Sequence, residues 1–180
     1  RKTIMWTDQR SVEECAWLKQ HHAAQIFATA WQMPTPTWTL PQLMWINRHE
    51  PEVIRATEHI LFVKDYVRYL VTGVSATDYI EAQGTLFYDM QNQKWSQELV
   101  ALTGLKASAL PKLVKPADRV GSVTESAARD TGIPAGTPVI CGSSDSAIED
   151  YGAGAVEPGD CIVKLATAGN VNVMTDRAIP

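Results

Sequence analysis

Asp145 is the residue whose type and position most readily suggest chemistry. The apolar run at 139–141 lies between Pro138 and Gly142 and predicts a short buried strand. A helical pattern follows over 146–151, so the carboxylate lies at the turn from strand to helix. A carboxylate there can accept a proton from an attacking hydroxyl, and the N-terminus of a helix attracts phosphate. The turn is therefore a candidate site for proton transfer beside a phosphate.

The same position has a purely structural interpretation. Aspartate just ahead of a helix is common, because its carboxylate satisfies free N–H groups and stabilises the helix dipole. Ser146 and Glu149 have the S-x-x-E spacing of a capping box, which predicts that the helix begins near Ser146. On the local pattern alone the structural interpretation is the commoner one, and both stay open at this point.

Two familiar classes of site are disfavoured at this turn. The nucleophile elbow of serine hydrolases needs G-x-S-x-G, whereas residues 142–146 read GSSDS and lack the second glycine. The dinucleotide fingerprint needs G-x-G-x-x-G, and the turn does not contain it.

A second candidate group consists of Trp6, Asp8 and Arg10. Trp6 is the last of residues 3–6, which the pattern predicts to be the end of a strand, and Asp8 and Arg10 follow it. Tryptophan offers an apolar face and an N–H donor, so the three side chains could stack on and hydrogen-bond to a sugar or polyol. The alternative is a core tryptophan beside an aspartate in a turn, which is the commoner arrangement.

A third candidate is a predicted hairpin near the end of the chain. Apolar strands are predicted at 161–165 and 171–174, and the turn between them reads ATAGN. The backbone of a small, hydroxyl-bearing turn could hold a phosphate. An ordinary hairpin turn explains the same residues.

The elements around these groups follow from capping and periodicity. Ser11 and Glu14 predict a helix running to about His22, and Ser96 and Thr124 are predicted N-caps. A further helix is predicted over 63–71, where Val63, Val67, Leu70 and Val71 hold helical spacing ahead of Gly73. Tyr66 on this helix is predicted to be a core residue.

The bulk properties describe an ordinary globular chain. It has 180 residues, of which 45% are hydrophobic and 20% charged, enough for one sizeable domain with a core. The net charge of −4 gives no support for nucleic-acid or anionic-membrane partners. Cys141 and Cys161 lie in apolar runs and are predicted to be buried thiols in a reducing compartment, so we expect a cytoplasmic location. No apolar run is long enough to predict a transmembrane helix or a signal peptide.

The order of the pieces is more specific than any one of them. The chain contains W-x-D-x-R, then LVTG ahead of Asp78, then W-S-x-E-L, and G-S-V-T-x-x-A-A-x-x-T-G-I-x-x-G-T-P-V. The G-x-x-D turn, GAG and a strand leading into ATAG complete the series. This series resembles the middle of an FGGY-family carbohydrate kinase of the xylulokinase type, over essentially the whole chain. Because the chain starts at Arg1 without methionine, we expect it to be part of a longer protein.

The resemblance implies an α/β fold, the actin-like ATPase architecture with two ribonuclease H-like domains flanking a cleft. Residues 1–157 would be the later part of the N-terminal, sugar-binding domain. Residues 158–180 would begin the C-terminal, nucleotide-binding domain.

The resemblance also implies roles for individual residues. Asp145 matches the family's catalytic base, which accepts the proton of the sugar hydroxyl as that oxygen attacks the γ-phosphate of ATP. Trp6 and Asp8, with Asp145, would bind the sugar. Thr167 and Gly169 match the second phosphate loop, usually G-T-S-G, although this chain reads ATAG there. ATP and Mg²⁺ are the implied cofactors, and no metal ligand is assigned within this chain.

The expected function is ATP-dependent phosphorylation of a ketopentose such as xylulose, with ribulose, glycerol and other polyols as alternatives. The first phosphate loop, an Asp-x-Gly-Thr pattern, is absent here, so this segment alone is expected to be inactive. The alternative function is a non-catalytic sugar-binding or regulatory module, which the altered ATAG loop would favour. A third interpretation, an actin-like chaperone ATPase, does not explain the Trp6-x-Asp8 pattern. The expected partners are the sugar and ATP, with no nucleic acid and no membrane, and a homodimer is left open.

Overall fold

The computed structural model describes residues 2–165 and 169–177. The chain divides into two compact units, Arg1–Gly142 and Ser143–Pro180, and each is described by itself.

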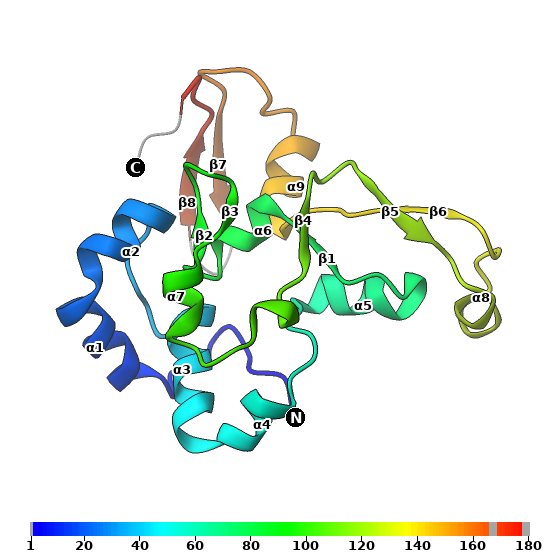
Figure 1. Ribbon diagram of the computed structural model, residues 1–180. Coiled ribbons are helices and arrows are strands. Elements are labelled where there is room, and N and C mark those ends of the chain that lie inside the picture. The colour runs from blue at the N-terminus through cyan, green and yellow to red at the C-terminus, as the bar shows by residue number, and fades with distance from the viewer. Residues whose placement is uncertain (1, 166–168, 178–180) are drawn as a thin grey trace. The chain divides into compact units, whose positions relative to one another are not determined.

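The first unit is mainly helical, with short strands between the helices (Figure 1). Its helices are α1 (Val12–His21), α2 (Ala23–Ala30), α3 (Thr39–His49), α4 (Pro51–Ala56), α5 (Val63–Thr72), α6 (Tyr79–Gln83), α7 (Gln97–Ala101) and α8 (Glu125–Thr131), with a 3₁₀ turn at Ala107–Ala109. Its strands are β1 (Ala76–Asp78), β2 (Tyr88–Asp89), β3 (Lys94–Trp95), β4 (Lys112–Val114), β5 (Arg119–Ser122) and β6 (Pro138–Ile140).

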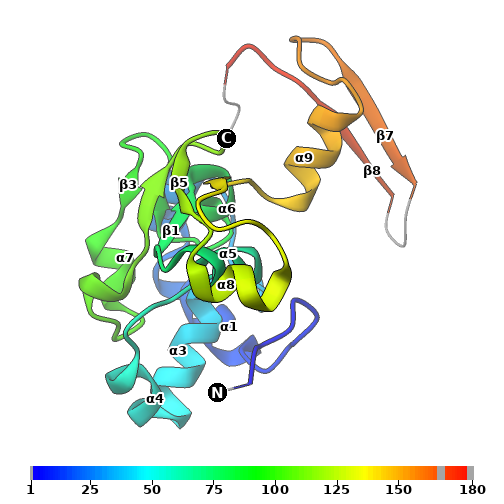
Figure 2. The same ribbon diagram turned by 90° about the vertical axis from the view of Figure 1, so that its right-hand side faces the viewer.

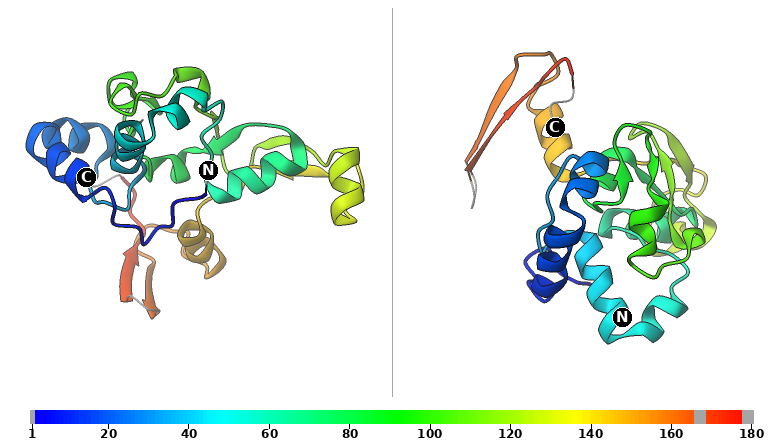
Figure 3. Two further views of the ribbon diagram at one scale, coloured as in Figure 1. Left: turned by 90° about the horizontal axis from the view of Figure 1, so that it is seen from below. Right: turned by 60° about the vertical axis from the view of Figure 1, so that its left-hand side comes forward.

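The strands of this unit form three separate pairs. β1 and β4 are parallel, whereas β2 pairs with β3 and β5 pairs with β6 in antiparallel register. The β5–β6 register shifts between Arg119 and Gly121, so this pair contains an irregularity. Helices α1 and α2 lie at one end of the unit and α8 at the other (Figures 1 and 3).

The hydrophobic core of the first unit lies among the early helices and the β2–β3 region. α1 packs against α2 and α3, and α2 packs against β2. Its fully buried side chains include Leu18, Ile26, Leu40, Phe87 and Leu99. Such residues stabilise the unit by removing apolar surface from water, about 25 cal/mol for each Å².

Helix α5 is oriented differently from the prediction. Its bounds and its left-handed stop at Gly73 are confirmed. Most of the apolar stripe, however, is exposed in this chain, with Val67 and Leu70 56% and 59% exposed and Val71 half-buried. The buried residues of the helix are Asp65, Arg68 and Thr72. Tyr66 is exposed as well, so its assignment to the core was wrong.

The second unit begins with α9 (Asp145–Gly152) and ends in a hairpin of β7 (Cys161–Leu165) and β8 (Gly169–Val173), which Figure 2 shows side by side. The carboxylate of Asp150 in α9 accepts two hydrogen bonds from Asn172 Nδ2, at 2.8 and 3.1 Å. At the turn into β7, Asp160 Oδ2 accepts from the backbone N–H groups of Val156 and Glu157, which lowers the pKa of Asp160. The predicted hairpin is confirmed.

Three details of the predicted elements were wrong. α9 starts at Asp145 and its N-cap is Ser144, whose Oγ accepts from Ala147 N, so Ser146 and Glu149 do not form a capping box. Ser11 precedes α1, but its hydroxyl donates to the carbonyl of Pro36 and does not cap the helix. Residues 3–6 form no strand in the described structure.

The cysteines were predicted half correctly. Cys141 is buried, whereas Cys161 is exposed because it lies on an outward-facing position of β7. Exposed and half-buried residues alternate along β7, so one face of this strand is partly covered within the described residues.

The predicted N-caps Ser96 and Thr124 are confirmed, and Thr124 offers a test. Its Oγ1 accepts from Ala127 N at 3.2 Å. We expect Thr124→Ala to lower the free energy of unfolding by about 1 kcal/mol, because the N–H of Ala127 in the first turn of α8 loses its hydrogen-bond acceptor. Urea unfolding of the parent protein measures this change. The exposed Ser126→Ala in the same helix is the control and should change stability by less than about 0.5 kcal/mol. Equal shifts in the two variants would contradict the capping role.

Candidate functional site

Asp145 is the first residue of α9, directly after a short turn that follows β6. The turn contains Gly142 with φ of 75°, a left-handed conformation that glycine adopts without steric cost. Asp145 is exposed, and its Oδ1 accepts a hydrogen bond from Ser146 N at 2.7 Å. Within the described residues Oδ2 accepts no hydrogen bond. One oxygen is thus held by the helix backbone while the other is available to accept a proton.

The surroundings of Asp145 in the second unit are charged. Lys164 on β7 forms an ion pair with Glu149 on α9. The hydrogen bond to Glu149 raises the pKa of Lys164, and the charges of Asp145 and Asp150 raise it further. Lys164 therefore stays protonated and adds positive charge near α9.

The carboxylate of Asp8 is held by Arg10. Arg10 Nε donates to Asp8 Oδ1 at 2.8 Å and Nη2 to Oδ2 at 2.6 Å, and the backbone N–H of Arg10 also donates to Oδ1. The hydrogen bond to Asp8 raises the pKa of Arg10. The guanidinium lies 4.9 Å from the ring centroid of Trp45, a cation–π distance. Asp8 and Arg10 of the W-x-D-x-R pattern thus form one ion pair, and Arg10 also contacts Trp45.

Trp6 is not a core residue. It is 76% exposed, and it lines a cavity of about 660 Å³ in the first unit. The lining of this cavity is largely apolar and includes Met5, Trp38, Phe62 and Trp95. Trp6 and Asp8 therefore have different environments, one at a cavity and the other in an ion pair.

Of the two residues predicted to contact phosphate, the structure describes one. Gly169 begins β8 and pairs with Leu165. Thr167 lies outside the described residues. Trp6 and Asp8 belong to the first unit, whereas Asp145 and Gly169 belong to the second.

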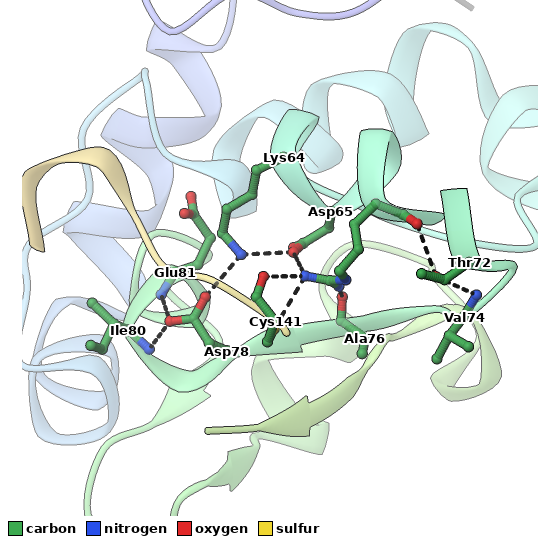
Figure 4. Close-up of polar contacts among 10 residues, drawn as sticks. Lys64, Asp65, Thr72, Val74, Ala76, Asp78, Ile80, Glu81 and Cys141 are labelled. Carbon is green, nitrogen blue, oxygen red and sulfur yellow. Dashed lines mark hydrogen bonds and ion pairs between the residues drawn. The ribbon is translucent and has the colours of Figure 1, made fainter. Parts of the chain in front are cut away.

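A buried polar cluster in the first unit was missed at the sequence level (Figure 4). Asp65 Oδ1 accepts from Lys64 Nζ at 2.7 Å and from Arg68 Nη1 at 2.9 Å. Lys64 Nζ also lies 2.9 Å from Asp78 Oδ2. Asp65 and Asp78 are fully buried, and two cations balance two carboxylates. The only signal in the sequence was the i, i+3 spacing of Asp65 and Arg68, on the face opposite the apolar stripe.

The cluster connects three segments of the first unit. Arg68 Nη1 donates to the carbonyl of Cys141 at 2.7 Å and lies 3.1 Å from its Sγ, and Arg68 Nη2 donates to the carbonyl of Ala76. Asp78 Oδ1 accepts from the N–H groups of Ile80 and Glu81 and so caps α6. The end of β6, strand β1 and helix α6 are therefore tied to α5.

The charges in this cluster perturb one another. Burial by itself lowers the pKa of Lys64, but hydrogen bonds to Asp65 and Asp78 outweigh it, and the pKa is raised. Burial raises the pKa of the Cys141 thiol, although Arg68 and Lys64 oppose this. Cys141 is thus a neutral thiol near pH 7, which does not suit a nucleophile.

In residues 2–165 and 169–177 no group of three or more His, Cys, Asp or Glu side chains could hold a metal ion. The same part of the chain has no helix long and apolar enough to cross a membrane.

Comparison with protein families shows which family this chain belongs to. The N-terminal domain of the FGGY family of carbohydrate kinases matches residues 1–152. The chain belongs to this family. The resemblance predicted from the ordered motifs is thereby confirmed.

Individual relatives agree with the family assignment. The chain is 32% identical over 169 residues to a xylulose kinase of Bacillus subtilis, a match covering 94% of this chain and 34% of the relative. It is 31% identical over 169 residues to a xylulose kinase of Escherichia coli, with the same coverage. The chain thus spans about a third of the length of these relatives.

Solved structures confirm the predicted fold class, the actin-like ATPase fold in partial form. The xylulose kinase from Rhodospirillum rubrum is 32% identical, with a TM-score of 0.94 over 99% of this chain and 37% of that one. Glycerol kinase from Plasmodium falciparum shares only the fold, at 16% identity and a TM-score of 0.85 over 93% of this chain and 34% of that one. The predicted domain boundary between residues 157 and 158 stays a prediction.

The buried cluster yields a stability prediction. We expect Lys64→Met in the parent protein to lower the free energy of unfolding by about 3 kcal/mol, because it leaves the Asp65–Asp78 side of the cluster short of one cation. Removal of one partner of a buried ion pair usually costs about 3–5 kcal/mol. We expect the lower value here, because 25% of the Lys64 side chain is exposed. The exposed Lys106→Met is the matched control and should change stability by less than about 0.5 kcal/mol. Overlapping urea unfolding curves for the two variants would contradict this account.

Proposed function

We propose that the parent protein phosphorylates a hydroxyl of a sugar or polyol with ATP, and that its acceptor is a ketopentose such as xylulose. Family membership supports the reaction class. The names of the relatives from Bacillus subtilis and Escherichia coli, both xylulose kinases at just over 30% identity, support the acceptor. Ribulose and glycerol are the alternative acceptors.

The observation that carries this proposal is the orientation and exposure of the Asp145 carboxylate. Its Oδ1 is fixed by Ser146 N at the first turn of a helix, and its carboxylate is exposed. An exposed, oriented carboxylate can accept the proton of the acceptor hydroxyl as that oxygen bonds to the γ-phosphorus of ATP and ADP leaves. In this proposal Asp145 is the general base and one of the sugar-binding residues.

The sugar would also meet residues of the first unit. Trp6 is exposed at the rim of a largely apolar cavity and presents a broad ring against which the carbon face of a sugar can pack. Asp8 is oriented by Arg10, and a carboxylate fixed in this way can accept hydrogen bonds from sugar hydroxyls. These two roles rest on the family resemblance together with these environments.

The nucleotide is assigned to the hairpin and to segments outside this chain. Thr167 and Gly169 would contact phosphate oxygens of ATP through a hydroxyl and a backbone N–H. Mg²⁺ would come with the ATP phosphates. The described residues contain no group of three or more His, Cys, Asp or Glu side chains that could hold it without the nucleotide. Three free cysteines fit a reducing compartment, which supports a cytoplasmic location.

A non-catalytic sugar-binding module is the second candidate. The departure of ATAG from the usual phosphate loop favours it. The presence of Asp145 favours the kinase, since a binding module needs no base at this turn. The two functions differ in one measurable property: the kinase transfers phosphate from ATP to the sugar, and the binding module does not.

We expect Asp145→Asn in the parent protein to lower kcat at least about 10³-fold, because an amide cannot accept the hydroxyl proton. Sugar affinity should change little. ADP release with Mg-ATP and D-xylulose, D-ribulose, L-ribulose, glycerol or no sugar measures transfer, and calorimetry measures sugar binding. The control is Asp130→Asn, the same change at an exposed position of α8. Turnover near that of the wild type in Asp145→Asn would refute the base assignment, and sugar binding without any transfer by the wild type would favour the non-catalytic module.

Thr167→Val tests the phosphate loop in the same assay. It replaces a hydroxyl by a methyl group of similar size, so we expect the KM for ATP to rise about tenfold and the KM for sugar to change little. The control is Thr175→Val, whose hydroxyl donates to the carbonyl of Arg177 beyond the hairpin. Equal changes in both KM values would argue against a phosphate contact.

A further inference from the structure

Thr77 has a buried hydroxyl that the fold itself does not use. The residue is the middle one of β1 and is fully buried, and within the described residues its Oγ1 has no hydrogen-bond partner. Buried hydroxyls are normally paired, because an unpaired one costs free energy. Thr77 also lines the cavity of about 660 Å³ at which Trp6 is exposed, and this cavity lies wholly within the first unit.

We infer that this cavity binds the sugar acceptor and that Thr77 and Glu81 are hydrogen-bonding residues of the site. The inference rests on the proposed function for the identity of the ligand. It adds two residues to the sugar site and states what each contributes.

The geometry of β1 explains why Thr77 belongs to the cavity. Its neighbour Asp78 belongs to the buried charge cluster, where Asp78 Oδ2 lies 2.9 Å from Lys64 Nζ (Figure 4). Successive side chains of a strand point to opposite faces, so the side chain of Thr77 lies on the other face from that of Asp78. The strand therefore supplies one polar side chain to the cluster and the next one to the cavity.

Glu81 brings a carboxylate to the same cavity. It lies in the first turn of α6, where Asp78 Oδ1 accepts from Ile80 N at 3.0 Å and from Glu81 N at 3.1 Å. Because Lys64 holds the other oxygen of Asp78, the start of this helix is anchored to α5 (Figure 4). The backbone of Glu81 is thus fixed, and its half-buried side chain forms part of the cavity wall.

The lining of the cavity indicates the class of ligand. Most of it is apolar or aromatic, including Trp38, Phe62 and Trp95, and the polar groups are few, as in most small-molecule sites. The carbon-bound hydrogens of a sugar can pack against such rings. A carboxylate accepts hydrogen bonds from hydroxyls, and a threonine hydroxyl both donates and accepts. An apolar molecule would use neither polar group, so the cavity fits a carbon chain with several hydroxyls.

The chemistry of position 77 also favours a ligand over a structural role. Valine has nearly the shape of threonine and would fill the same space without an unpaired hydroxyl. The hydroxyl therefore lowers the stability of the protein without ligand and is useful only when a ligand pairs with it. Rotation about χ1 moves the hydroxyl between staggered positions, so it can turn toward a bound molecule.

Thr77→Val in the parent protein is the main test. We expect the Kd for D-xylulose to rise about tenfold, because the ligand loses one hydrogen bond. The urea midpoint of the protein without ligand should stay the same or rise, since no protein partner is lost. Thr77→Ser keeps the hydroxyl and should keep the Kd within about threefold of the wild-type value.

Thr103→Val is the matched control. Thr103 is equally buried, but its Oγ1 donates to the carbonyl of Val100 at 2.6 Å and accepts from Leu105 N at 3.1 Å, and it is not part of the cavity lining. This variant should lower the urea midpoint and change the Kd for sugar by less than about twofold. A lowered midpoint in Thr77→Val, together with an unchanged Kd, would mean that Thr77 has the same structural role as Thr103 and would overturn the inference.

Calorimetry without ATP measures sugar binding separately from phosphate transfer. If the wild type binds D-xylulose in a way that depends on Thr77 but releases no ADP with Mg-ATP, the proposed function is wrong and the cavity is still a sugar site. If the wild type transfers phosphate and Thr77→Val binds the sugar as tightly as the wild type, the inference alone is wrong.

Glu81→Gln covers a failure of Thr77→Val to fold. It keeps the shape of the side chain but removes the charge, and hydrogen bonds to charged groups are the stronger ones. We expect the Kd for D-xylulose to rise about tenfold. The control is Glu52→Gln at an exposed position of α4, which should leave the Kd unchanged. Equal Kd values for Glu81→Gln and the wild type would overturn the inference.

Discussion

The arrangement of the strands in the first unit depends on the hydrogen bonds that the Arg68 guanidinium donates. The guanidinium donates to the carbonyls of Ala76 in β1 and Cys141 after β6, and both segments belong to strand pairs too short to fix themselves. Two-stranded pairs of about three residues are marginal without packing against a further element. The helix that supplies the arginine is therefore also what orients the strands.

This arrangement explains why α5 buries its polar face. Asp65 and Arg68 form contacts to backbone groups that a valine or leucine could not form, so they occupy the inner side of the helix. Neutrality makes the burial tolerable, since Lys64 and Arg68 balance Asp65 and Asp78 and each charge has an opposite partner. Val67 and Leu70 then face outward within this chain.

The sequence predicted some levels of structure better than others. Local signals worked well, because a cap such as Thr124 or a stop such as Gly73 acts within a few residues. The burial of α5 could not be predicted, because periodicity identifies an apolar face and contains no information on long-range hydrogen bonds to Ala76 or Cys141. The start of α9 was placed one residue late, since Ser144 and Ser146 are both acceptable caps and only the backbone geometry chooses between them. The family was predicted correctly from the order of motifs, which samples the whole chain at once.

The candidate site shows where local reasoning ends. At the first turn of α9, Asp145 fits a carboxylate that stabilises a helix N-terminus and an oriented base equally well, since one oxygen accepts from Ser146 N and the carboxylate is exposed. Those two descriptions differ only in what lies opposite the second oxygen. A carboxylate that only stabilises its helix needs no accuracy beyond that helix, whereas a base must keep its oxygen within hydrogen-bond reach of a bound hydroxyl. The hydrogen bonds that hold the backbone of Cys141 lie in the first unit and Asp145 lies in the second, so they do not distinguish the two interpretations.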